Sequence, residues 1–139
     1  MTETTETPAT TETPAPTVWP CLIYADAPAA IRFLVEAFGF VETLVVPGEG
    51  GREIEHAQLR WPEGGGVMLG SSSEDSPFGR VTYCANYVVT DHPDELFKRC
   101  TGAGAQVVRE LRDEEYGSRG FTVRDPAGNL WSFGTYRGA

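Results

Sequence analysis

The sequence predicts an α+β domain made of two tandem βαβββ modules, whose strands form a curved mixed sheet or two half-barrels around a groove, with the helices outside. One order of strand and helix patterns occurs twice between residues 18 and 137. Matching residues also recur at a nearly constant distance. Asp26 and Asp91 are 65 positions apart, Pro28 and Pro93 keep that distance, and further along it becomes 64. Self-similarity of this kind indicates a duplicated fold.

The first module is expected at about residues 18–70. Residues 18–25, VWPCLIYA, are apolar and rich in strand-forming types, and Pro28 then suits the first turn of a helix. The helix is predicted to end at Gly39, and its apolar stripe has the spacing i, i+3, i+4, i+7: Ile31, Leu34, Val35 and Phe38. Three strands are expected to follow, at 42–47, 53–61 and 66–70, with glycine-rich turns between them.

The second module is expected at about residues 83–137, after a polar linker at 71–82. A strand at 83–90 precedes a helix from Pro93 to Gly104, and strands follow at 106–111, 119–124 and 130–136. One module alone would leave one face of its sheet bare, so the two are expected to combine around one groove.

The composition and charge of the chain argue against some classes of function. Residues 1–17 hold only Thr, Pro, Glu and Ala after Met1, so they are predicted to be a disordered tail. The net charge of −9 disfavours nucleic acid as a partner. Three cysteines without a CxxC spacing predict a cytoplasmic protein, and no segment is long and apolar enough to predict a membrane span.

Two motifs carry a resemblance to a known family. The first helix reads DAPAAIRFL and ends with Phe38-Gly39-Phe40, and residues 121–132 read FTVRDPAGNLWS. Within the duplicated architecture, the DPxGN turn and this helix resemble the vicinal-oxygen-chelate superfamily, the fold of glyoxalase, extradiol dioxygenase and bleomycin-resistance proteins. The resemblance covers about residues 18–137 and is greatest for the small glyoxalase and bleomycin-resistance types.

The resemblance also identifies where metal-dependent members hold their metal. In this register the four ligand positions are Trp19, Met68, Cys84 and Ser132. Divalent metals need several imidazole or carboxylate ligands, which this set lacks. The prediction is therefore a protein without a metal or another cofactor, in which metal-dependent glyoxalase or dioxygenase chemistry does not occur.

Strand alternation predicts what lines the groove, because side chains alternate between the two faces of a sheet. If Ser132 and its counterpart Met68 face the groove, the other predicted substrate-binding residues converge with them on one cavity. These are Trp19, His56, Gln58, Cys84, Asn86 and Thr122.

Three side chains suit more than one role. His56 is a candidate general base or a structural strand histidine, and Cys84 is a candidate nucleophile or an inert thiol. Trp61 suits either the pocket or the core.

Three functions compete. The first is a metal-free protein that sequesters or carries a small, partly aromatic ligand. The second is a metal-independent isomerase or lyase that uses His56 or Cys84. The third is a module whose groove is filled by side chains. The resemblance also implies a possible homodimer, because some family members complete their groove with a second copy.

Overall fold

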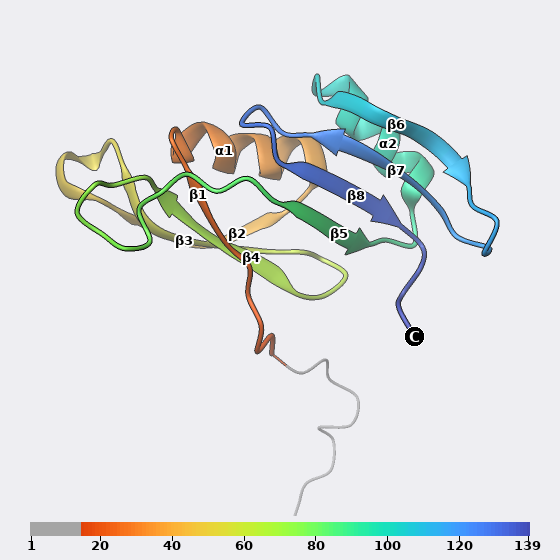
Figure 1. The fold of residues 1–139 in the computed structure, drawn as a ribbon, viewed down its shortest axis with the longest axis horizontal. Helices are drawn as coiled ribbons and strands as arrows, with labels where there is room; N and C mark the ends of the chain where they lie inside the picture. Colours follow the sequence, from red (N-terminus) through yellow and green to blue (C-terminus); the bar gives the residue numbers. More distant parts are fainter. Residues whose placement is uncertain (1–14) are drawn as a thin grey trace, which may run out of the picture.

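The computed structural model describes residues 15–139, which form two four-stranded mixed sheets and two main helices, without a closed barrel (Figure 1). The predicted α+β fold of two βαβββ modules is confirmed. Residues 1–14 of the predicted tail lie outside the described residues. None of the helices in the described part is long and apolar enough to span a membrane.

The first sheet has the strand order β1-β4-β3-β2. β1 pairs in parallel with β4, and the other neighbours are antiparallel. Helix α1 packs on β1 and β4, and the short helical turn η3 continues it to Phe38. The elements of this module are β1 (Cys21–Tyr24), α1 (Ala27–Phe33), η3 (Leu34–Phe38), β2 (Val41–Pro47), η4 (Glu49–Gly51), β3 (Ile54–Arg60) and β4 (Gly66–Ser71).

The second sheet repeats this topology in the order β5-β8-β7-β6, with β5 parallel to β8. Helix α2 packs on β6 and β7 and also contacts η3, so it bridges the two modules. Its Arg99 guanidinium donates hydrogen bonds to the carbonyl oxygens of Val35 and Glu36 at the end of the first helix. The elements are β5 (Ala85–Val89), α2 (Pro93–Gly102), β6 (Gln106–Asp113), β7 (Arg119–Arg124) and β8 (Leu130–Gly134).

One hydrophobic core joins the helices to one face of each sheet. Its centre is aromatic, because Trp131 packs against Phe38 and Phe40, and Trp61 packs against Phe40 and Phe133. Trp61, which suited either the pocket or the core, is a core residue whose Nε1 donates to the Val89 carbonyl of the other module at 2.9 Å. The opposite face of each sheet is left open.

A buried carboxylate also ties the modules together. Asp125, in the DPxGN turn, is 4% exposed and accepts hydrogen bonds from the Tyr24 hydroxyl at 2.7 Å and from the Trp131 indole at 3.1 Å. It also accepts from the backbone amides of Ala127 and Asn129. Burial, and then the negative charge of Asp125, raise the pKa of Tyr24, so its hydroxyl stays protonated and continues to donate.

The internal register differs from the predicted one by one residue at the start of each module. Cys21 lies beside Met68, whereas Tyr87 lies beside Ser132, so the first strands are related by 66 positions and not by 65. The helix starts agree with this shift, since Asp26 caps α1 and His92 caps α2. Asp91, which the sequence pairs with Asp26, instead forms an ion pair with Arg137.

Candidate functional site

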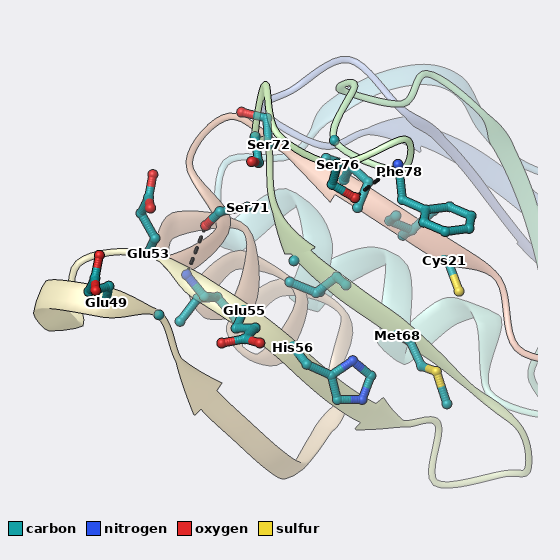
Figure 2. Close-up of a pocket in the computed structure, with 18 residues that line it drawn as sticks. Cys21, Glu49, Glu53, Glu55, His56, Met68, Ser71, Ser72, Ser76 and Phe78 are labelled. Carbon is teal, nitrogen blue, oxygen red and sulfur yellow. Dashed lines mark hydrogen bonds between the residues drawn. The ribbon is translucent and has the colours of Figure 1, made fainter.

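The open face of the first sheet carries a candidate site. A cavity of about 630 Å³ lies there, within the size range of small-molecule sites, and we call it the first-sheet cavity (Figure 2). Its lining comes from β1, β3, β4, the turn before β3 and the segment after β4: residues 21–23, 48, 49, 53–56, 68–73, 76, 78 and 79.

The apolar part of this cavity comes from neighbouring strands. Cys21 and Ile23 on β1 lie beside Met68 and Gly70 on β4, and these four residues share the open face. Phe78, in the segment after β4, contributes an exposed ring to the same cavity. Met68 adds a flexible thioether to the lining and Phe78 adds an aromatic ring, and both groups suit a flat apolar ligand.

His56 lines the cavity, and Gln58 follows it on the same face of β3. The Gln58 side-chain amide nitrogen lies 3.0 Å from His56 Nε2. Because that nitrogen is a donor, Nε2 accepts, and the neutral ring then carries its proton on Nδ1. His56 therefore has a fixed ring orientation and a donor free for a ligand.

A β-bulge in β3 changes which side chains reach the cavity. His56 lies opposite Val46 and Ile54 lies opposite Pro47, so Glu55 is an extra residue in the ladder. Ile54 and Ala57 are both buried in the core although they are three positions apart, which simple alternation does not allow. The bulge brings Glu55 to the same cavity as His56, and Figure 2 shows the two side chains next to each other along β3. The sequence pattern placed them on opposite faces.

The open face of the second sheet carries a smaller cavity of about 140 Å³. The hydroxyls of Thr122 and Ser132 lie 2.7 Å apart there. Tyr87 lies over Gly134, where a Cβ atom would come within 2.8 Å of the tyrosine hydroxyl, so a larger residue at this position would require Tyr87 to move. Burial is the main cause that raises the pKa of Tyr87, which stays a neutral phenol and donates to the Tyr136 carbonyl at 2.8 Å.

The predicted residues do not converge on one cavity. His56 and Met68 line the first-sheet cavity, whereas Thr122 and Ser132 line the cavity of the second sheet. Gln58 shares the open face with Met68, its partner across β3 and β4. The single predicted cavity is wrong for one chain because each sheet exposes its own open face.

Trp19 lies at the far end of the first open face, away from the cavity. Its ring packs over Gly66, where a Cβ atom would come within 2.9 Å of the indole, and the Arg60 guanidinium lies 5.9 Å from the ring centre. A Cβ atom at position 66 would also meet the backbone carbonyl oxygen of Leu59, and the two contacts together explain why the chain has glycine there.

Cys84 and Asn86 do not face the groove, which corrects their predicted placement. Asn86 lies beside Trp131 in the sheet, on the opposite face from Tyr87 and Ser132. The Cys84 thiol donates to Asn129 Oδ1 at 3.5 Å and accepts from the Asn86 amide at 3.3 Å. Neither amide can take up a proton, so Cys84 has no general base among these partners. The cause is the one-residue register shift, which exchanges the two faces of β5. Tyr87 takes the open position, and repeat spacing alone could not reveal it.

The donor set does not fit a divalent metal. With the corrected register, the family's four ligand positions hold Trp19, Met68, Ala85 and Ser132, which offer only a thioether and a hydroxyl. Between residues 15 and 139, no three His, Cys, Asp or Glu side chains are grouped in a way that could hold a metal ion.

Residues 17–133 match the family model described as the Glyoxalase/Bleomycin resistance protein/Dioxygenase superfamily. The chain belongs to this superfamily. Among its relatives are two mycobacterial proteins that are described as uncharacterized, Mb0911c of Mycobacterium bovis and Rv0887c of Mycobacterium tuberculosis. Both are 40% identical over 124 residues, covering 83% of this chain and 80% and 71% of the two relatives.

Solved structures of the superfamily show the same fold. TioX from Micromonospora sp. ML1 is 37% identical, with a TM-score of 0.71 over 84% of this chain and 97% of TioX. A glyoxalase/bleomycin resistance protein/dioxygenase from Nocardioides is 18% identical, with a TM-score of 0.59 over 91% of this chain and 87% of its own. The second likeness supports the fold alone.

Proposed function

We propose that this protein binds a small, partly aromatic molecule on the open face of the first sheet, without a metal, and sequesters or carries it. The observation that carries the proposal is the first-sheet cavity, which combines apolar strand residues with carboxylate, imidazole and hydroxyl groups. His56 supplies a hydrogen-bond donor, and Met68 and Phe78 supply the apolar contact. Trp19 would contact only a ligand long enough to reach beyond Met68.

Binding of a neutral fluorescent probe tests this function. We expect N-phenyl-1-naphthylamine, which fluoresces more strongly in apolar surroundings, to bind the full chain with a micromolar dissociation constant. The affinity should fall about tenfold when Met68 is changed to Glu, because a charge is then buried against the apolar ligand. Thr101→Glu adds the same charge at an exposed position of helix α2, outside the cavity lining, so it is the matched control and should have little effect. Equal affinities for all three proteins would contradict the proposal.

A metal-independent isomerase or lyase is the second candidate, because the bulge brings the Glu55 carboxylate and the His56 imidazole to one cavity. An imidazole beside a carboxylate suits general acid–base chemistry. Cys84, the other predicted catalytic residue, is on the opposite side of the second sheet. Native mass spectrometry of the purified protein separates the two functions, since a carrier keeps its ligand unchanged and an enzyme converts it.

We propose further that a second copy of the chain completes the groove. The first-sheet cavity is lined only by residues of the first module and the linker, and the second cavity only by residues of the second module. Each is open on one side, and β2 at the edge of the first sheet exposes Val41, Leu44 and Val46. Covering one sheet with the other sheet of a second copy would bury these apolar residues.

Light scattering of the purified full chain measures the assembly. We expect the mass of two 15.1 kDa chains at micromolar concentration, and Val46→Glu should shift the mass toward that of one chain. A single-chain mass for the unmodified protein would overturn the homodimer. The cavity also suggests a small molecule, and not a nucleic acid or a membrane, as the partner, and three free cysteines suit the cytoplasm.

A further inference from the structure

We infer that the ligand of the first-sheet cavity carries a positive charge, as an alkylammonium or amidinium group on an apolar frame. This inference rests on the proposed binding function and adds the chemical class of the ligand. The cavity itself is defined by its apolar strand residues, and the charged groups at one of its ends decide which ligand it accepts.

Three glutamates line this end of the cavity. Glu49 lies in the turn η4, Glu53 precedes β3, and the bulge directs Glu55 to the same side. Figure 2 shows Glu53 and Glu49 near the turn and Glu55 beside His56. No Lys or Arg is among the described residues that line the cavity.

Charged side chains of the second sheet form ion pairs, whereas the three glutamates of the first-sheet cavity form none with the described residues. On the second sheet, Arg112 and Arg109 share Glu114 at 3.0 and 4.0 Å, and Arg119 pairs with Asp94 and Asp113. Between residues 15 and 139, no ion pair involves Glu49, Glu53 or Glu55. The three glutamates of the first-sheet cavity therefore lie beside its apolar strand residues without an ion-pair partner among residues 15–139.

Two polar groups, His56 and Ser71, lie next to these carboxylates in the cavity lining. The His56 ring accepts from Gln58 at Nε2 and presents the N–H of Nδ1, and Ser71 uses its hydroxyl to accept from the Ile54 amide at 2.8 Å. A cation at this end would satisfy several carboxylate oxygens through charge-assisted hydrogen bonds while its apolar part covers Ile23 and Met68.

The test compares three probes of one shape by calorimetry with the full-length protein. They are 2-naphthylmethylammonium, which is cationic, 2-naphthalenemethanol, which is neutral, and 2-naphthoate, which is anionic. At low ionic strength we expect the cation to bind about tenfold more tightly than the alcohol, because exposed ion pairs each contribute a few-fold. The carboxylate probe should bind most weakly. At about 0.5 M salt the preference should fall to about twofold, since salt screens partly exposed charges.

Two double variants show whether the effect is local. Glu53→Gln/Glu55→Gln should reduce the preference for the cation to less than about twofold while the neutral alcohol still binds. Glu110→Gln/Glu115→Gln removes the same total charge from residues outside the cavity and should keep the preference.

The outcomes separate this inference from the proposed function. Equal binding of all three probes by the unmodified protein would overturn the ligand class and keep the binding function. Loss of the preference in both double variants would assign it to net charge and overturn the local inference. No binding of any probe, together with no binding of N-phenyl-1-naphthylamine, would overturn both.

Discussion

Replacing Asp125 with alanine should lower the free energy of unfolding by about 3 to 5 kcal/mol. Three buried groups, the Tyr24 hydroxyl, the Trp131 indole and the Asn129 side-chain amide, would lose their shared acceptor. Each buried donor without a partner costs about 1–3 kcal/mol. Because the bond to Tyr24 crosses between the modules, the loss should affect the whole domain and not only the DPxGN turn. Urea unfolding followed by tryptophan fluorescence measures it.

Two controls identify the cause of that loss. Asp91→Ala removes a carboxylate from an exposed ion pair with Arg137 and should change stability by less than about 0.5 kcal/mol. Tyr24→Phe removes one donor and leaves Asp125 its other partners, so it should cost about 1 kcal/mol. If Asp125→Ala costs no more than Asp91→Ala, the buried network does not hold the modules together.

Changing Cys21 to Trp should weaken the binding of N-phenyl-1-naphthylamine at least tenfold. Cys21 lines the first-sheet cavity, beside Met68, and its exposed position accepts a larger side chain without moving the core. An indole there would occupy the space that the ligand needs. Fluorescence titration of the full chain measures the affinity, and thermal unfolding should show a nearly unchanged midpoint.

The internal duplication supplies the matched control, because Tyr87 occupies the position in the second sheet that corresponds to Cys21. Tyr87→Trp exchanges one large aromatic ring for another and should change the affinity by less than about threefold. If Tyr87→Trp abolishes binding and Cys21→Trp does not, the ligand binds on the second sheet and the proposed site is wrong.

Sequence patterns were sufficient for the parts of this fold that depend on local spacing. The apolar stripe at Ile31, Leu34 and Phe38 identified the first helix, because a helical period brings these side chains to one buried face. Alternation within single strands also predicted that Thr122 and Ser132 share one face of the second sheet.

The errors came from single-residue changes that leave no clear mark in the sequence. Asp26 and Asp91 look equivalent, yet Asp26 caps its helix and Asp91 does not, so the strand before each helix is shifted by one residue. This shift turned Cys84 and Asn86 away from the groove and put Tyr87 there. The bulge at Glu55 is similar, since only the pairing of β3 with β2 reveals the extra residue.

The sequence by itself determined the two βαβββ modules, their apolar faces and the superfamily, because these follow from periodicity and from turn residues with strict backbone needs. Only the tertiary structure decided which side chains share a cavity. The side-chain period of a strand is two, so one inserted residue exchanges the faces, and the backbone hydrogen bonds between strands set that register. The same pairing divides the predicted groove between two open faces, and it places Glu55 beside His56 in one cavity.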